Sequence, residues 1–194
     1  PDGVTSIGDH AFYECTGLTG ELIIPDSVTS IGKYAFKGCS GLTGIWVSGD
    51  NSNYSSDERG VLFNKDKNEL IQAPGGISGN YVIPNSVTSI GNSAFSSCTG
   101  LTSVTLGNGL ETIGSSVFSS CTALTGVLII PDSVTSIGEE AFIQCTGLTS
   151  VTIGNSVETI GSSAFYGCTS LTSVTLGNSV KTISGSTFSR CTSL

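Results

Sequence analysis

A phenylalanine followed three positions later by a cysteine returns along the whole chain at a nearly constant interval. Successive cysteines are 24, 59, 23, 24, 23 and 23 residues apart, so a single interval departs from the period. The pairs are Phe12 with Cys15, Phe36 with Cys39, Phe95 with Cys98, Phe118 with Cys121, Phe142 with Cys145, Phe165 with Cys168 and Phe188 with Cys191. A fixed period between roughly 20 and 50 residues predicts a solenoid, whose coils pack only against their neighbours.

Two further apolar positions share this frame, an isoleucine five residues before each phenylalanine and a leucine six residues after it. The isoleucines are Ile7, Ile31, Ile90, Ile113, Ile137, Ile160 and Ile183, and the leucines are Leu18, Leu42, Leu101, Leu124, Leu148, Leu171 and Leu194. One coil cannot bury such a face, whereas stacked coils bury four continuous columns. We therefore expect residues 1–194 to form a single right-handed solenoid of about eight coils.

The segment Val104-Thr105-Leu106 shows what one coil should contain. Its alternation of apolar and polar residues predicts a short strand with Thr105 pointing outward. The Gly-Asn-Gly sequence of residues 107–109 then turns the chain. The Val-Thr-Ser-Ile-Gly and Ser-Ala-Phe stretches that follow are too short and too rich in serine for a long helix. We expect one short parallel strand per coil and a far side of turns or short helical turns.

The interval between Cys39 and Cys98 contains an irregular stretch, residues 50–79. Within it, Gly60–Phe63 and Glu69–Gln72 flank a polar run at 64–68, which predicts a hairpin. Insertions in repeat proteins commonly map to one face, and that face is often the binding face. The other interpretation is a longer coil that completes the core.

The charge of the chain excludes some classes of partner. The net charge is −8 and the seven basic residues are scattered, so no basic stripe exists to bind phosphates. No apolar run approaches the roughly 20 residues of a membrane-spanning helix. We expect no nucleic-acid partner and no membrane insertion by this segment. The chain starts at Pro1 and stops at Leu194, both inside a repeat, which indicates a fragment of a longer chain.

The seven cysteines occupy one repeated position beside the phenylalanines, which favours packed, reduced thiols over a disulfide pattern. The alternative is a disulfide between neighbouring coils, which requires Cα separations below roughly 7 Å.

Residues suited to metal binding or catalysis are sparse. There are no Cys-x-x-Cys pairs, and His10 is the only histidine, so no zinc site and no base for a serine nucleophile are predicted. The Asp50–Asn53 stretch with Asp57 and Glu58 offers oxygen ligands but lacks the ordered calcium loop of about 12 residues. We expect no metal, no cofactor, no catalytic residue and no enzyme activity.

The outward strand positions form the candidate ligand-binding surface. In frame they are Ile23, Trp46, Val82, Thr105, Ile129, Thr152 and Thr175. Trp46 is the only tryptophan, and the alternation in Ile45-Trp46-Val47 points its indole outward. Exposed aromatic residues are common at binding hot spots. The alternative is that Trp46 packs beneath the irregular stretch, covered by Tyr54 or Tyr81.

A longer phrase recurs at residues 24–43, 83–102 and 130–149: Ile-Pro-x-Ser-Val-Thr-Ser-Ile-Gly-x-x-Ala-Phe-x-x-Cys-x-x-Leu-Thr. It resembles the BspA-type leucine-rich repeat of surface proteins from oral and gut anaerobic bacteria and trichomonads. The irregular stretch is similar to a long-repeat variant of that family. The resemblance implies a leucine-rich-repeat solenoid and adhesion to host extracellular proteins or other bacteria, and it transfers no catalytic residue.

Two functions from different classes follow. The first is a cell-surface or secreted recognition and adhesion module. It would bind a protein, such as a host matrix protein or another cell's surface protein, or a glycan, through the strand face near Trp46. The second is a structural spacer that presents another domain. Since no polar caps cover the ends of the array, end-to-end self-association is also expected.

Overall fold

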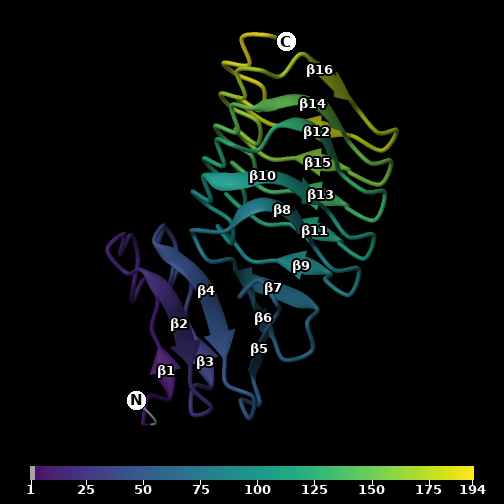
Figure 1. Cartoon of the computed structure of the whole chain (residues 1–194). Coiled ribbons are helices and arrows are strands. Elements are labelled where there is room, and N and C mark those ends of the chain that lie inside the picture. Colours follow the sequence, from purple (N-terminus) through teal and green to yellow (C-terminus); the bar gives the residue numbers. More distant parts are fainter. Residues whose placement is uncertain (1–2) are drawn as a thin grey trace.

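The computed structural model describes residues 3–194 and shows a solenoid of about eight coils (Figure 1). The coils are made of strands and turns, and the described residues contain no helix. It follows that this part of the chain has no helix with the length and apolar character that crossing a bilayer requires. The repeat solenoid predicted from the period is therefore confirmed.

Each regular coil contributes one longer strand to a common face, which we call the strand face. These strands are β2 (Gly20–Ile24), β4 (Leu42–Val47), β8 (Ser78–Val82), β10 (Gly100–Thr105), β12 (Gly126–Ile129), β14 (Leu148–Thr152) and β16 (Ser173–Thr175). They pair in parallel, as expected, but form three separate sheets: β2 with β4, β8 with β10, and β12 with β14 and β16.

The division into three sheets coincides with a glycine in the first strand of each. Gly20, Gly79 and Gly126 have left-handed backbones, with φ of 80°, 73° and 79°. The pairing shifts register beside each of them, as a β-bulge does when it accommodates an extra residue. Glycine suits these positions because it adopts positive φ without steric cost. The extra residue lies in the strand of the following coil, at Thr43 of β4, Thr102 of β10 and Thr149 of β14.

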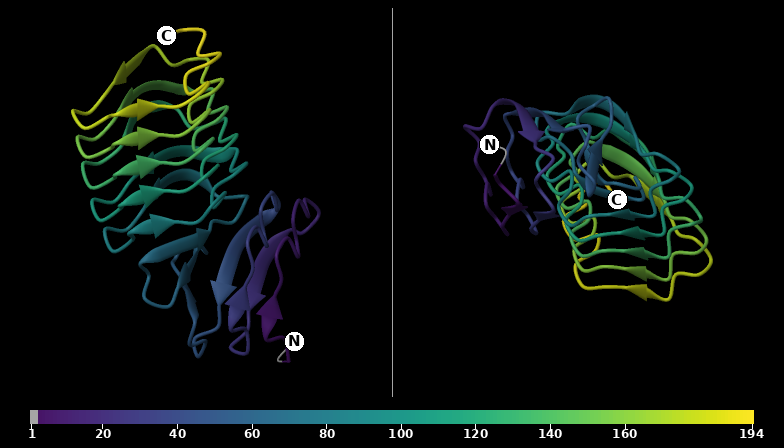
Figure 2. Two further views of the ribbon diagram at one scale, coloured as in Figure 1. Left: turned by 180° about the vertical axis from the view of Figure 1, so that it is seen from behind. Right: turned by 90° about the horizontal axis from the view of Figure 1, so that it is seen from below.

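The far side of the solenoid contains strands where the sequence predicted turns or short helical turns. Most are Ser-Ile or Thr-Ile dipeptides: β1 (Ser6–Ile7), β3 (Ser30–Ile31), β9 (Ser89–Ile90), β11 (Thr112–Ile113), β13 (Ser136–Ile137), β15 (Thr159–Ile160) and β17 (Thr182–Ile183). The odd-numbered strands β9, β11, β13, β15 and β17 pair in parallel along one side of the C-terminal coils (Figure 2). Two residues are too few to show alternation in sequence, and only stacking makes them strands.

The core contains the predicted columns, together with further buried positions such as Val87, Val134 and Val157. Neighbouring phenylalanine rings from Phe95 to Phe188 stack with centroids 5.0 to 5.5 Å apart. All seven cysteines are free thiols and six are buried, while Cys15 in the first coil is exposed. Each of five buried thiols, from Cys39 to Cys191, donates to the carbonyl of the phenylalanine one coil earlier, and Cys98 bonds Pro74 O instead.

The irregular stretch forms three strands, β5 (Tyr54–Ser56), β6 (Leu62–Asn64) and β7 (Glu69–Gln72). They pair antiparallel in this order, so a hairpin stands where the sequence predicts one, and β7 then pairs in parallel with β9. Leu62 joins the core of the N-terminal coils and Phe63 that of the C-terminal coils. This stretch therefore completes the core of both parts of the solenoid.

Candidate functional site

The seven predicted strand-face residues occupy equivalent positions in the strand pairs. Ile23 lies opposite Trp46 and Val82 opposite Thr105. Ile129, Thr152 and Thr175 lie side by side in the third sheet. Because successive side chains on a strand point to opposite faces, the matched register places all seven on the outward side. The frame derived from the sequence therefore matches the register of the strands, which form three sheets, and the role of these residues in ligand binding stays a prediction.

The strand face exposes apolar side chains that the fold does not need for its core. Ile23 is 66 % exposed, Val82 57 %, and Val127 and Ile129 63 % each. The three threonines of the row are exposed as well. The other large hydrophobic residues with comparable exposure belong to the first or last coils, at Val4, Tyr13, Leu176, Ile183 and Leu194. Val127 and Ile129 project from the same strand, β12, and neighbouring exposed apolar side chains commonly mark an interaction site.

Trp46 is half-buried, so it is neither fully exposed on the strand face nor fully covered. Its indole lies against Gly44 on the same strand, where an added Cβ would approach Trp46 Nε1 to 2.5 Å. The Nε1 atom is buried and has no hydrogen-bond partner among the described residues. Tyr54 and Tyr81 are engaged elsewhere, since their hydroxyls bond Ile31 N and Asp57 Oδ2. Gly60 of the irregular stretch lies against Gly44, and its carbonyl accepts from Ile45 N at 2.8 Å, so this stretch packs beside the strand that carries Trp46.

The strand face is hollowed over the C-terminal coils into a groove of about 620 Å³. Four of the seven predicted residues line it, namely Thr105, Ile129, Thr152 and Thr175. Its single charged lining residue is Asp132, whose Oδ1 accepts a hydrogen bond from Asn155 N at 2.6 Å. The groove therefore presents methyl groups and hydroxyls, which suit contact with a partner surface better than bond-breaking chemistry.

The cysteine thiols buried in the core pack between neighbouring coils. Burial raises the pKa of Cys121 and of Cys168 to about 12, and raises the pKa of Cys98 and Cys145 well above the ordinary thiol value. Such thiols are protonated and poorly nucleophilic at neutral pH. Among the described residues no three His, Cys, Asp or Glu side chains gather as a metal site would require.

The Asp50–Glu58 stretch, whose oxygens were considered for calcium, uses its polar groups within the fold. Asn51 is buried, and its Nδ2 donates to the carbonyls of Pro25 and Val28 at 2.9 and 3.0 Å. Asp57 Oδ1 accepts from the backbone of Arg59 and Val61, at 2.9 Å each. These bonds anchor the irregular stretch to its neighbours.

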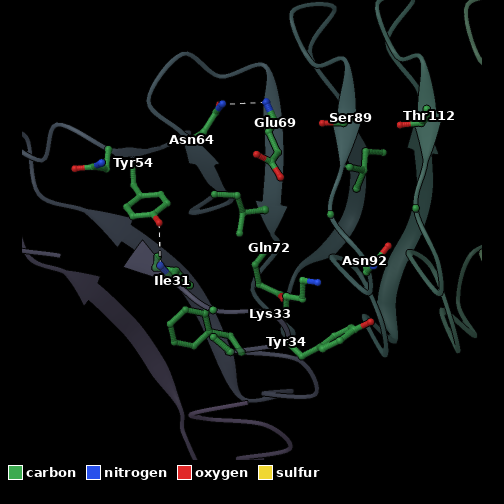
Figure 3. Close-up of a pocket in the computed structure, with 18 residues that line it drawn as sticks. Ile31, Lys33, Tyr34, Tyr54, Asn64, Glu69, Gln72, Ser89, Asn92 and Thr112 are labelled. Atoms are coloured by element: carbon green, nitrogen blue, oxygen red, sulfur yellow. Dashed lines mark hydrogen bonds between the residues drawn. The ribbon is translucent and has the colours of Figure 1, made fainter. Parts of the chain in front are cut away.

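A second hollow, of about 640 Å³, opens on the far side between β3 and the strands β7, β9 and β11 (Figure 3). None of the residues predicted from the sequence to bind a ligand lines this hollow. A signal was nevertheless present, because the one interval of 59 residues contains a coil without the Phe-x-x-Cys turn. A missing turn leaves a gap between the turns on either side.

The architecture defines the class of protein: a leucine-rich-repeat solenoid. Residues 1–68 and 78–194 match the BspA type leucine rich repeat region in six copies, so the chain belongs to the BspA-type leucine-rich repeat family. No protein of curated function matches the sequence.

Solved structures with the same fold come from bacteria. A leucine rich cell surface protein from Faecalibacterium prausnitzii is 35 % identical with a TM-score of 0.91, over 100 % of this chain and 51 % of that one. A leucine-rich repeat protein from Eubacterium ventriosum is 27 % identical with a TM-score of 0.75, over 98 % and 60 %. The pneumococcal vaccine antigen PcpA, 24 % identical with a TM-score of 0.66 over 92 % and 47 %, shares the fold. This chain thus spans about half the length of these proteins.

Proposed function

We propose that this chain is a non-catalytic recognition module of a cell-surface or secreted protein, and that it binds a protein partner through the strand face. The observation that carries the proposal is the pair Val127 and Ile129, each 63 % exposed, in a groove that three threonines also line. Burial of such side chains on binding supplies roughly 25 cal/mol per Å² of apolar surface. The Faecalibacterium relative, a cell surface protein, supports the location.

The C-terminal groove is a better centre for this interface than Trp46. Ile129 stands free of its own sheet, whereas the indole of Trp46 already packs against Gly44. A partner gains more from covering a side chain that is still in water. Trp46 and Ile23 would then form the N-terminal edge of the contact surface.

The test measures binding of the full chain to a panel of purified extracellular-matrix proteins by surface plasmon resonance. The variant Ile129→Asp should weaken a saturable interaction by at least about tenfold, because it places a charge in the apolar row. The matched control Thr159→Asp alters an exposed residue of the far-side sheet and should bind like the parent. If no partner binds saturably, the chain is better described as a spacer. If both variants bind as tightly as the parent, the interface does not include the strand face at Ile129.

A further inference from the structure

The far-side cleft lies where one turn of the solenoid is missing. In the regular coils, a Phe-x-x-Cys turn follows each short strand and packs against the turn of the next coil. The coil built from the irregular stretch continues from β7 into Ala73 and Pro74 instead. The turn after β3 and the turn after β9 are therefore separated, and the cleft occupies the space between them (Figure 3).

One wall of the cleft carries backbone N–H groups at positions that, in the other coils, donate hydrogen bonds to the next coil. His10 N donates to Lys33 O at 3.0 Å, and matching bonds join all the later turns that have a following turn. Tyr34 and Phe36 hold the donor positions in the second coil, and both line the cleft. Within residues 3–194 their N–H groups have no acceptor. Equivalent geometry directs these two donors into the cleft.

The opposite wall presents acceptors. Asn92 corresponds to Lys33 by its place after the Ile-Gly pair, yet its carbonyl receives no hydrogen bond from the described part of the chain. Its side-chain Oδ1 accepts from Ser115 N at 2.8 Å, which leaves the amide hydrogens available. Gln72 Nε2 donates to the carbonyls of Ala73 and Ala94 at 3.0 and 2.9 Å, which leaves Oε1 as an acceptor.

Aromatic rings and balanced charge complete the lining. Tyr34 extends from the β3 side of the cleft toward Asn92, and Tyr54 is held by its hydroxyl, which accepts from Ile31 N at 2.9 Å (Figure 3). Lys33 and Glu69 are the charged residues of the lining, one of each sign. A ligand of either charge therefore gains little net attraction. The volume falls in the range of roughly 300–1,000 Å³ typical of small-molecule sites.

We propose that this cleft binds a neutral glycan, independently of the strand face. Sugar hydroxyls both donate and accept, so one ring can satisfy the N–H groups of Tyr34 and Phe36 and the carbonyl of Asn92 together. The apolar C–H face of a sugar ring packs on an aromatic side chain such as Tyr34. An extended peptide fits less well, because Tyr34 has a left-handed backbone, with φ of 58°, and cannot continue a regular strand ladder.

The test is saturation-transfer difference NMR on the full chain, with neutral monosaccharides and disaccharides of glucose, galactose, mannose, fucose and N-acetylglucosamine at millimolar concentration. At least one sugar should bind saturably. Ser89→Trp should block the cleft and weaken this binding by about tenfold or more. Its matched control, Ser136→Trp, changes the same repeat position two coils further on, outside the cleft, and should leave binding unchanged.

A second pair of variants tests the aromatic contact without filling the cleft. Tyr34→Ala should weaken sugar binding by about tenfold, whereas Tyr166→Ala, which removes a half-buried tyrosine outside the cleft, should not. Near-ultraviolet and far-ultraviolet circular dichroism would establish that each variant folds. The proposal is overturned if no neutral sugar binds, if Ser89→Trp and Tyr34→Ala bind like their controls, or if peptide display selects an extended peptide that Ser89→Trp abolishes while sugars do not bind.

Discussion

The thiol of Cys145 donates a hydrogen bond to the backbone carbonyl of Phe118, 3.1 Å away and one coil earlier. The bond recurs between Cys121 and Phe95 and between Cys168 and Phe142. Each cysteine therefore binds the preceding coil as a small buried side chain that also satisfies a polar group. This arrangement explains why the cysteine repeats in register with the phenylalanine.

Thiol reactivity should divide the cysteines sharply. Cys15 is exposed, while burial raises the pKa of Cys121 and Cys168 to about 12, so their thiolate is scarce at pH 8. We expect a maleimide to label Cys15 alone in the native protein and all seven cysteines in denaturant. Mass spectrometry after labelling would give the count. Rapid native labelling of Cys121 or Cys168 would contradict the buried column.

Removal of a ring from the middle of the phenylalanine stack should be costly. Phe142 is fully buried with neighbouring rings on both sides at 5.1 Å, so Phe142→Ala should lower the free energy of unfolding by about 3–5 kcal/mol. Phe12 is half-buried and contacts one ring at 5.6 Å, so Phe12→Ala should cost less. Urea unfolding of both variants measures the difference, and equal losses would count against a continuous core.

The bulge glycines should be sensitive to backbone conformation and insensitive to side-chain volume. A Cβ on Gly126 would meet nothing within 4 Å, but its φ of 79° is unfavourable for alanine, so Gly126→Ala should cost about 1–2 kcal/mol. Asparagine tolerates this backbone better, so Gly126→Asn should cost less. Thermal unfolding would rank the two variants. A more harmful asparagine would indicate a steric cause.

Gly138, in contrast to Gly126, should be sensitive to side-chain volume and not to backbone conformation. A Cβ there would lie 2.6 Å from the backbone of Gly114 in the preceding coil, so Gly138→Ala must push the coils apart. We expect a loss of about 1–3 kcal/mol, with no relief from asparagine. The pair Gly126 and Gly138 thus separates a glycine required for its φ from one required for close approach.

Trp46 should tolerate phenylalanine. Its Nε1 is buried without a hydrogen-bond partner, and such a group costs about 1–3 kcal/mol. Trp46→Phe should therefore leave the stability nearly unchanged, because the lost contact area is offset by removal of the unpaired N–H. Chemical unfolding measures this, with acrylamide quenching of the parent as an independent check of partial burial. A loss above about 3 kcal/mol would place Trp46 in the core.

The end coils of the 194-residue chain should promote self-association. Ile183 and Leu194 are 49 % and 56 % exposed although their columns are buried in the inner coils, and Cys15 is exposed at the other end. Stacking of one array on another would bury these residues. Sedimentation velocity over a range of concentrations should show oligomers that Ile183→Lys reduces. A monomer at all concentrations would refute the expectation.

The sequence by itself determined the period, the four core columns and the outward row of the strand face. These follow from counting, because the four apolar residues of one coil, such as Ile137, Phe142, Cys145 and Leu148, can be buried only by stacking similar coils. The hairpin at β6 and β7 was also predictable from its flanking apolar runs. The two-residue far-side strands were not, since Ser136–Ile137 carries no periodicity and is a strand only through its neighbours.

Only the tertiary structure decided how the coils meet. It showed that the strand face is divided into three sheets, each beginning with a strand that contains a glycine of positive φ, and that Trp46 lies against Gly44 while Ile129 stays in water. It also showed that the missing turn leaves the N–H groups of Tyr34 and Phe36 facing a cleft. The physical reason is that register, ring orientation and unpaired backbone groups depend on contacts between coils, which a repeat pattern within one coil does not contain.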